Sequence, residues 1–531
     1  MESGGKRNKR QADEEGGQAK RGSAAKAAAA AHADQEALQF DDPFGDDEIE
    51  EEEEEIVAQD GSAMEQDEDA LDYDKHEAEE MNARAKQGPA RLFRPGVDKL
   101  DADEELEYDN SAYMMLHRMQ VEFPFLSFDF IRDSLGEHRV RFPKTSFMVG
   151  GTQAPGAHQH KLSIIKMSEM HKTRKDRQEE EEASDSDSDS DDDGLDDDAV
   201  LDFRSIKHTG AVNRVRSMPQ CSNIVASWSD AGRVYMWDVK PHLTSLGAYG
   251  KATAPAASSL ENAAPIFAFK GHKDEGYAMD WSPVKAGRLA TGDCRRFIHI
   301  WDVTESGVCV VNDTPYLSHT SSVEDLQWSP TEESVFASCS VDLSVRIWDV
   351  RDHNKSMLAI ENAHEQDVNV IAWNRKVPFL CASGSDDGSI KVWDLRKLKS
   401  KEKNEPVGHF RWHTGPIYSL EWHPQDDTVL VAAGGDNQVS VWDFGLEEDP
   451  EQANIAPKLQ SEVIGGAGEK LDIPPQLLFL HQGQNEIKEV HFHSQIPGMI
   501  GSTAGDGFHV FIPEPLDPKG IAKYLAPTPS A

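Results

Sequence analysis

The sequence has little cysteine and no long apolar run. Its five cysteines are scattered and include no C-x-x-C pair, which argues against a disulfide framework or a zinc site. No apolar stretch approaches the ~18 residues of a membrane span, and the polar N-terminus does not read as a secretory signal. No Walker or dinucleotide-binding fingerprint occurs. We therefore expect an intracellular protein with no membrane span and no cofactor.

Positive charge is also scarce. The chain carries 54 Lys and Arg against 96 Asp and Glu, a net charge of −42 at pH 7. Because nucleic-acid binding depends on Lys and Arg neutralising phosphates, this balance disfavours direct DNA readout and favours basic partners. The acid is clustered at residues 50–55 and 179–198, which indicates interaction tails rather than a merely soluble surface. We expect a monomer that binds basic proteins.

The first residues form a basic tail. Its two clusters have the pattern of a bipartite nuclear-import signal, the alternative being an ordinary basic tail. The clusters consist of Lys6, Arg7, Lys9, Arg10, Lys20 and Arg21. The segments predicted in order are this tail (1–32), an acidic disordered arm (33–98), a helix with strands (99–170), an acidic serine-containing disordered loop (171–199), a repeat domain (200–515) and a C-terminal tail (516–531).

Residues 101–120 show helical periodicity. Leu106, Tyr113, Leu116 and Met119 recur near the 3.6-residue spacing of a helix, and acidic residues stand at its start, where the helix dipole favours them. Strand-like runs follow at 125–131, 140–149 and 162–166. The sequence predicts an N-terminal helix followed by strands.

From residue 208 onward the sequence repeats itself. Five units place a His 29 residues before a Trp-Asp pair, while the spacing between units varies. The fixed interval suits three strands of one sheet, and the variable part is loop. A sixth unit, from His481 to Phe511, is one residue longer and lacks the Trp. The five pairs are His208/Trp237, His272/Trp301, His319/Trp348, His364/Trp393 and His413/Trp442.

This pattern resembles the WD-repeat family over residues 208–512. In that family the repeated His, Ser or Thr, Asp and Trp brace each blade by hydrogen bonds. Because such a set recurs in successive units, bracing is favoured over a catalytic triad, and we expect no enzyme. Full sets are His319, Ser338, Asp342 and Trp348, and His364, Ser383, Asp387 and Trp393. Departures are Asp230 one place early in the first unit, Arg295 at the Asp position of the second, and Ala432 at the Ser position of the fifth, whose bracing we expect to be incomplete.

Six repeats leave one blade short of a seven-bladed ring. The strands at 125–166 can supply it, so the N-terminal region closes the ring and pairs its exposed edges. The predicted fold class is all-β, a seven-bladed WD-repeat propeller with an N-terminal helix and long acidic disordered segments.

Three stretches resemble the retinoblastoma-associated histone-binding WD proteins. They are residues 113–129 (YMMLHRMQVEFPFLSFD), 213–220 (NRVRSMPQ) and 472–481 (DIPPQLLFLH). In those relatives the N-terminal helix and the double-proline loop form a groove for a histone helix. The resemblance implies a similar groove here.

The glutamate-rich WD-repeat proteins are more similar still, over roughly residues 90–512. The features shared are 292–294 (GDC), 322–332 (SVEDLQWSPTE), 336–340 (FASCS), 421–426 (EWHPQD), Phe511 in place of Trp, and the two acidic runs. This resemblance implies a nucleolar ribosome-biogenesis factor that escorts a large-subunit ribosomal protein (L-three) into pre-ribosomal particles and can bind histones. A dedicated histone chaperone in chromatin is the alternative.

Two surfaces are candidates for holding the basic client. The first is a groove between the predicted helix and the segment 447–475, with apolar residues for an amphipathic client helix and carboxylates for its Lys and Arg; the alternative is a helix that only caps the ring. Its residues are Tyr113, Leu116, Met119, Glu447, Glu448, Asp449, Asp472, Pro474 and Pro475. The second is the upper face of the ring, where resemblance carries the acidic contacts onto Glu275 and Glu324, with Asn369 nearby. Solvated loop charge is the alternative there.

Two further motifs suggest regulation. Asp349 with Arg351, and Asp394 with Arg396, resemble the Trp-Asp-x-Arg box that docks some WD proteins on cullin-RING ubiquitin-ligase adaptors, although Arg after a last strand is common by chance. A substrate receptor of such a ligase is therefore an alternative function. Residues with Asp one and three places later suit an acidophilic kinase, unless the loop stays unmodified. These are Ser184, Ser186, Ser188 and Ser190.

Overall fold

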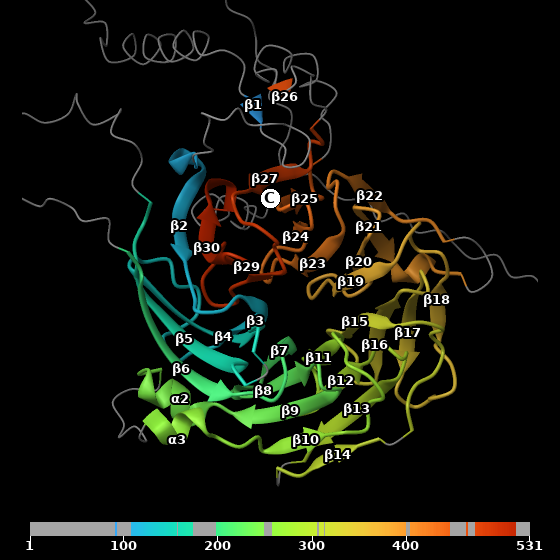
Figure 1. Ribbon diagram of the computed structural model, residues 1–531. Coiled ribbons are helices and arrows are strands. Elements are labelled where there is room, and N and C mark those ends of the chain that lie inside the picture. The colour runs from blue at the N-terminus through green and yellow to red at the C-terminus, as the bar shows by residue number, and fades with distance from the viewer. Residues whose placement is uncertain are drawn as a thin grey trace, which may run out of the picture. The chain divides into compact units, whose positions relative to one another are not determined.

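Seven four-stranded antiparallel sheets form the blades of a ring in the computed structural model (Figure 1). The structure describes residues 91–92, 108–156, 158–173, 198–248, 257–304, 307–312, 314–399, 404–446, 464–465 and 473–516. The innermost strands of neighbouring blades contact one another in a closed circle. The predicted seven-bladed propeller is confirmed.

The first blade is made from sequence that precedes the repeats, as predicted. Blade 1 contains β3 (Phe125–Ile131), β4 (Lys144–Thr152), β5 (Lys161–Met170) and β6 (Val200–Lys207). Blade 2 contains β7 (Val212–Met218), β8 (Cys221–Ser229), β9 (Arg233–Asp238) and β10 (Phe267–Phe269). Blade 3 contains β11 (Met279–Trp281), β12 (Arg288–Gly292), β13 (Ile298–Val303) and β14 (Cys309–Val311).

The next three blades follow the repeats in order. Blade 4 contains β15 (Val323–Trp328), β16 (Val335–Ser340), β17 (Val345–Asp349) and β18 (Leu358–Ile360). Blade 5 contains β19 (Val368–Trp373), β20 (Leu380–Ser385), β21 (Ser389–Asp394) and β22 (Gly408–Arg411). Blade 6 contains β23 (Ile417–Trp422), β24 (Val429–Gly434), β25 (Val439–Asp443) and β27 (Leu477–His481).

The last blade joins the two ends of the described chain. Blade 7 contains β28 (Glu489–Phe492), β29 (Ile500–Ala504), β30 (Gly507–Pro513) and, as its outermost strand, β2 (Tyr113–Met119). Minor elements are β1 (Arg91–Leu92), which pairs in parallel with β26 (Ile464–Gly465), the helices α2 (Lys240–Ser245) and α3 (Ala257–Glu261), and the 3-10 turns Asn110–Ala112, Leu395–Lys397 and Glu514–Leu516.

The predicted N-terminal helix is wrong across residues 113–119. This segment is strand β2, paired antiparallel with β30 from Tyr113↔Pro513 to Met119↔Phe508. A bulge between Tyr113 and Met115 shifts the register, so Tyr113 and Leu116 pack into one core cluster and Met115 and Met119 into another. Apolar residues on both faces of the strand therefore imitate the spacing of a helix. Residues 101–107 of the prediction lie outside the described residues. β2 nevertheless closes the ring, the task expected of the N-terminal region.

Apolar side chains fill the spaces between adjacent blades. One cluster joins Ala278 and Ala290 of blade 3 to Leu326 and Phe336 of blade 4, and similar clusters occupy the other interfaces. Four of the five repeat tryptophans, Trp301, Trp348, Trp393 and Trp442, are among the largest fully buried side chains. Burial of apolar area between blades therefore stabilises the ring as a whole.

The repeated histidines brace their blades as predicted. In blade 4, His319 lies 2.9 Å from Asp342 and 2.7 Å from the Ser338 hydroxyl, which also accepts the Trp348 indole N–H at 2.8 Å. Burial lowers the pKa of His319, so the neutral imidazole links the carboxylate to the hydroxyl. These residues are scaffold.

The expectation of incomplete bracing in the fifth repeat is wrong. Ala432 stands directly across the strand pair from Ser440, and Ser440 provides the hydroxyl. His413 lies 2.7 Å from Ser440 Oγ, and the Trp442 indole N–H donates to the same oxygen at 2.8 Å. Asp436 completes the set at 3.0 Å from His413.

In two other repeats that depart from the usual residue pattern, a different group contacts the repeat His. In the second repeat, Asp293 takes the place left by Arg295 and lies 3.1 Å from His272. In the first repeat, His208 contacts the Gly210 carbonyl at 2.8 Å in place of Asp230. The blade brace is thus a local geometry that different residues satisfy.

Candidate functional site

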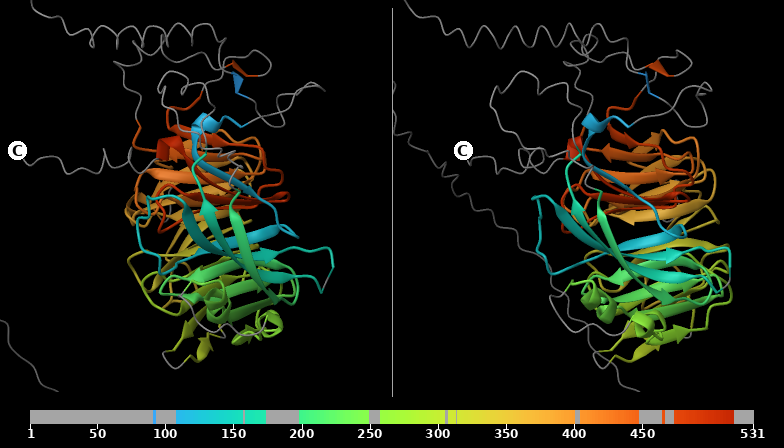
Figure 2. Two further views of the ribbon diagram at one scale, coloured as in Figure 1. Left: turned by 90° about the vertical axis from the view of Figure 1, so that its left-hand side faces the viewer. Right: turned by 60° about the vertical axis from the view of Figure 1, so that its left-hand side comes forward.

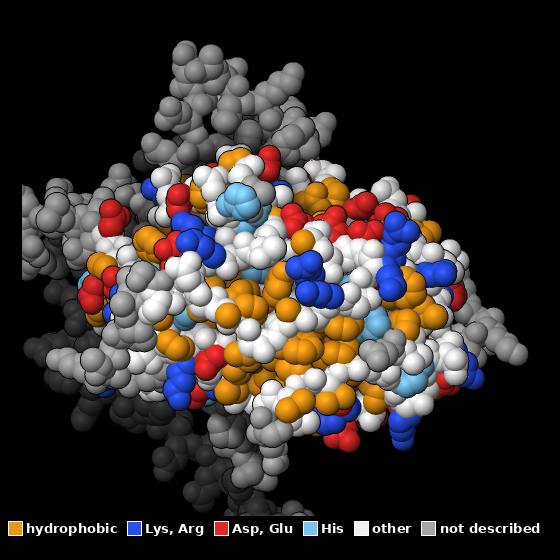
Figure 3. Space-filling model, turned by 60° about the horizontal axis from the view of Figure 1, so that its bottom comes forward, with side chains coloured by type: hydrophobic (Ala, Val, Ile, Leu, Met, Phe, Trp, Pro, Cys, Tyr) orange, Lys and Arg blue, Asp and Glu red, His pale blue; other side chains and the backbone are white. Residues whose placement is uncertain are grey.

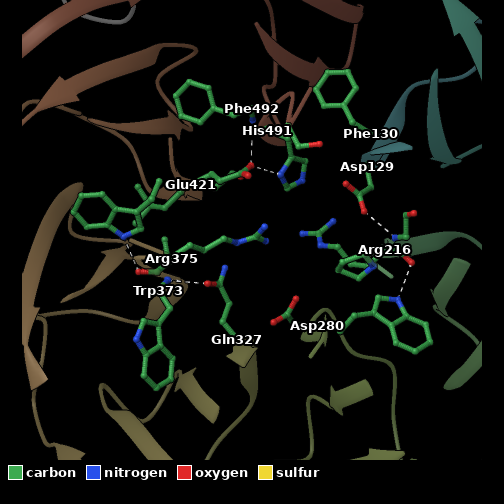
Figure 4. A pocket seen from close by; sticks show the side chains of 18 of the residues that line it. Asp129, Phe130, Arg216, Asp280, Gln327, Trp373, Arg375, Glu421, His491 and Phe492 are labelled. Carbon is green, nitrogen blue, oxygen red and sulfur yellow. Dashed lines mark hydrogen bonds and ion pairs between the residues drawn. The ribbon is translucent and has the colours of Figure 1, made fainter. Parts of the chain in front are cut away.

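We call the face where the innermost strands begin the upper face, and the face where they end the lower face. Charged side chains line the axial channel near the lower face (Figure 4). Three of these carboxylates, together with the amide of Gln327, occupy the same strand position and accept a main-chain N–H from the next blade. The bonds are Asp129 from Ser217 at 2.7 Å, Asp280 from Trp328 at 2.8 Å, Gln327 from Trp373 at 2.7 Å and Glu421 from Phe492 at 3.2 Å. These side chains latch one blade to the next.

Glu489 links the last blade to the first two. It accepts the Phe128 N–H at 2.7 Å, Arg214 at 2.5 Å and Arg216 at 2.7 Å. Burial disfavours its charge, but the two guanidinium groups outweigh burial and hold its pKa well below the usual range. Glu489 therefore closes the ring electrostatically where β2 closes it by strand pairing.

His491 joins the same network between two carboxylates. Its Nδ1 lies 2.6 Å from Glu421, and its Nε2 lies 3.5 Å from Glu489. Burial lowers its pKa, but Glu421 and Glu489 outweigh burial and raise the pKa to about 9. Asp280 across the channel has a pKa raised by burial to about 7. The cavity here, about 170 Å³, is lined largely by groups that hold the ring.

Carboxylates also gather at the upper mouth of the channel, with a different set of contacts. Glu275 accepts the Asn213 amide at 2.9 Å, and Asn369 donates to Asp386 at 2.7 Å. Burial raises the pKa of Glu324, and the charges of Asp367 and Asp386 raise it further. The structure thus places Glu275, Glu324 and Asn369 at the same end of the channel, and their role in holding a client stays a prediction.

Asp367 and Asp386 extend this arc and were missed by sequence reasoning. Each stands within or beside a blade-5 loop, and burial, followed by the charge of Asp386, raises the pKa of Asp367. Both belong to the repeat that begins at His364, so the repeat pattern could have identified them. We define the upper acidic arc as Glu275, Glu324, Asp367 and Asp386. Tyr277 lies beside it, and burial together with Glu275 and Glu324 raises its pKa to about 12.

The predicted client groove loses its helical wall. Tyr113 and Met119 are buried strand residues, and the Tyr113 hydroxyl lies 2.8 Å from His481 in the bracing of the last blade. Leu116 and Pro474 are half-buried, and Pro475 is exposed. Glu447, Glu448, Asp449 and Asp472 lie outside the described residues. The groove as predicted from a helix is therefore not formed by residues 113–119.

The two Trp-Asp-x-Arg boxes lie at the ends of β17 and β21. Arg351 pairs with Asp349, and Arg396 donates to Asp394 at 2.9 and 2.8 Å while stacking on Phe379 at 3.4 Å. Both arginines remain largely exposed despite these bonds. The import-signal residues and the four predicted phosphoserines lie outside the described residues.

The described ranges contain no helix long and apolar enough to span a membrane. In the same part of the chain, no three His, Cys, Asp or Glu side chains are placed to hold a metal ion.

The closed ring and its braces define a WD-repeat propeller. The "WD domain, G-beta repeat" model matches residues 311–349, 355–394 and 404–443. A second family model, for "Histone-binding protein RBBP4" or its counterpart in the CAF1 complex, matches residues 103–171. This second match covers β2 to β5, the segment that closes the ring.

Similar proteins span nearly the full chain. "Ribosome assembly protein rrb1" of Schizosaccharomyces pombe is 43% identical and covers 90% of this chain and 94% of its own. "Glutamate-rich WD repeat-containing protein 1" of Dictyostelium discoideum is 45% identical over 80% and 85%, and "Protein HEAT STRESS TOLERANT DWD 1" of Arabidopsis thaliana is 47% identical over 83% and 94%. The chain belongs to the family of glutamate-rich WD-repeat and ribosome assembly proteins.

Proposed function

We propose that this protein escorts a strongly basic client, a large-subunit ribosomal protein (L-three), into pre-ribosomal particles in the nucleolus, and that it can also bind histones. The upper acidic arc is the observation that supports this proposal most directly. Its carboxylates accept side-chain amides and, unlike the lower set, no main-chain N–H of the next blade, so they can meet Lys and Arg of a client. The function is one of binding, without catalysis.

Family membership supports the same client class. A ribosome assembly protein handles basic proteins, and the match to a histone-binding model points to basic partners as well. The net charge of −42 adds long-range attraction that increases the rate of encounter. The basic tail and the kinase-type serines are proposed to serve nuclear import and to strengthen client binding after phosphorylation.

The test compares carboxylates on the upper and lower faces of blades 3 and 4. Glu275→Gln/Glu324→Gln should lower the affinity for purified L-three and for histones by about tenfold at low salt. The control is Glu332→Gln/Glu333→Gln, which removes the same charge from exposed lower-face positions. Equal affinity in both double variants, measured by pull-down at graded salt, would refute an upper-face site.

The segment 447–449 with Asp472 remains a second part of the proposed client surface. Charge reversal at Glu447, Glu448 and Asp449 should weaken binding of a basic helical client. Persistent binding would exclude this segment. Deleting residues 33–98 in parallel separates a contribution of the acidic arm from that of the ring.

A ubiquitin-ligase substrate receptor is the second candidate function. The exposed arginines of the two boxes favour it. Reversing Arg351 and Arg396 to Glu should abolish adaptor binding and leave binding of basic clients unchanged. Unchanged adaptor binding would rule this function out.

A further inference from the structure

A recess lined by basic side chains lies at the lower rim of blade 1. It is formed by the loop between β3 and β4, whose Arg139 N–H donates to the Gln495 carbonyl of blade 7 at 3.0 Å. Figure 2 shows blade 1 from outside the ring. The recess has a volume of about 160 Å³, and no carboxylate is among the described residues that line it. Its walls include the cations Arg139, Arg141 and Lys144, the hydroxyl-bearing Thr145, and the apolar Leu135 and Ile496.

Lys144 is the buried cation of this recess. The residue is 3% exposed, and its ammonium donates to the Arg139 carbonyl at 2.9 Å and lies 4.3 Å from the centre of the Phe142 ring. Burial, followed by the charges of Arg139 and Lys172, lowers its pKa to about 8. No carboxylate in the part of the chain that the structure describes pairs with it. Because a buried cation without a counterion is costly, an anion in the recess would stabilise Lys144.

The acidic side chains of the same loop are already paired. Asp133 accepts both terminal nitrogens of Arg139 at 2.9 Å, and Glu137 accepts Arg132 at 2.6 Å. Arg139 Nε is buried and has no acceptor among the residues described. These pairs therefore leave the positive charge of the recess unbalanced.

Two exposed cations add to this charge. Arg141 lines the recess, and the Lys172 ammonium lies 5.5 Å from the centre of the Phe142 ring. Neither side chain pairs with a carboxylate of the described ranges. On the face shown in Figure 3, by contrast, Lys and Arg side chains are dispersed, with apolar and acidic side chains between them. In a chain with a net charge of −42, the recess is thus a local concentration of unpaired positive charge.

The number of cations indicates a phosphate monoester as the ligand. Such a group carries about two negative charges and three acceptor oxygens, which suits three cations better than one carboxylate does. A nucleic-acid backbone fits less well, because it needs cations along an extended path and is repelled by the net charge of −42. The loop also exposes apolar side chains, Leu135 at 49% and Val140 at 55%, which suit a peptide with apolar residues beside its phosphate.

We propose that this recess binds a phosphorylated peptide segment of a partner protein, with the phosphate at Arg141, Lys144 and Lys172. The apolar neighbours of the phosphate contact Leu135 and Val140. The site lies at the lower rim, away from the upper acidic arc, and selects the opposite charge. It is independent of the proposed binding of basic clients and gives the protein a second partner, controlled by phosphorylation.

The probe is a synthetic peptide with one phosphoserine between two Leu-Val pairs, tested on the full chain by fluorescence anisotropy. We expect it to bind about tenfold more tightly than the same peptide with Ser or with Glu at that position. Inorganic phosphate should compete with the peptide at high concentration, because it satisfies the same cations.

Variants of the full chain assign the binding to this recess. Arg141→Gln/Lys172→Gln removes its two exposed cations, and its control Lys355→Gln/Lys376→Gln removes the same charge from other exposed positions of the lower face. Lys144→Met removes the buried cation at similar side-chain length. We expect Arg141→Gln/Lys172→Gln and Lys144→Met each to weaken peptide binding about tenfold, with the control and the affinity for L-three unchanged. Equal melting temperatures establish that the variants are folded, and if Lys144→Met unfolds, Arg141→Gln/Lys172→Gln decides alone.

Three results would overturn the proposal. Equal binding of the Ser or the Glu peptide would show that the recess does not recognise phosphate. Unchanged binding in Arg141→Gln/Lys172→Gln, or an equal loss in its control, would place the contact elsewhere. Tighter binding of a single-stranded RNA than of the phosphopeptide, lost in Arg141→Gln/Lys172→Gln, would assign the recess to nucleic acid.

Discussion

Carboxylates occupy two levels of the same channel and make different contacts there. Near the lower face, Asp129, Asp280 and Glu421 each accept a main-chain N–H from the following blade. At the upper mouth, Glu275 and Asp386 accept side-chain amides. The comparison teaches that acidic character alone does not identify a client site, because the lower set is committed to holding the ring.

The largest expected effect is at the centre of the lower network. Glu489→Ala leaves Arg214 and Arg216 buried without their shared carboxylate, which should cost about 3–5 kcal/mol in the free energy of unfolding. Urea unfolding measures it. The control Glu365→Ala, at an exposed side chain, should cost less than about 0.5 kcal/mol. A similar small loss in both variants would contradict the ring-closing role of Glu489.

A smaller effect is expected from the brace of the fifth repeat. Ser440→Ala removes the oxygen shared by His413 and Trp442 and should cost about 1–3 kcal/mol. The double variant Ser440→Ala/Ala432→Ser returns a hydroxyl from the opposite strand and should recover part of this loss. If Ser440→Ala leaves urea unfolding unchanged, the blade does not depend on this brace.

The pH dependence of stability should report the lower network. Because the folded pKa of His491 is raised from 6.5 to about 9, its contribution is present below pH 6.5 and is lost as pH rises through about 9. Thermal melts across this range should show a loss on the order of 1 kcal/mol. His491→Gln should flatten the profile. An unchanged slope in that variant would assign the titration to other groups.

The smallest effect on stability is expected at the upper acidic arc. Glu275→Gln/Glu324→Gln should change the free energy of unfolding by less than about 0.5 kcal/mol, because neither carboxylate bonds the main chain of the next blade. Thermal melts alongside Glu421→Gln, which removes a latch, make the comparison. Equal losses of stability in both variants would contradict the assignment of different roles to the upper and lower carboxylates.

The sequence predicts the propeller well because its signals are local and repeated. The interval between each His and Trp-Asp covers three strands of one blade, so the number of repeats gives the number of blades except for the one made by the N-terminal region. The prediction of a helix fails at Tyr113–Met119 because both faces of this strand carry apolar side chains, on either side of a bulge. Ser440 was missed because its equivalence to the Ser position exists only across a strand pair.

The candidate site was predicted only in part. Glu324 and Asn369 each lie five residues after their repeat His, and Glu275 lies three residues after its own, so all three fall in the stretch that leads into an innermost strand. The latches could not be predicted, since an Asp in one blade meets an N–H of the next only when the two blades pack side by side.

The most direct test of the account measures affinity for L-three and melting temperature on the same samples. The samples are the unmodified chain, Glu275→Gln/Glu324→Gln and Glu421→Gln. We expect Glu275→Gln/Glu324→Gln to lose affinity and keep its melting temperature. We expect Glu421→Gln to unfold at a lower temperature and, below that temperature, to keep its affinity. The reverse pattern, or unchanged affinity in the upper variant, would contradict it.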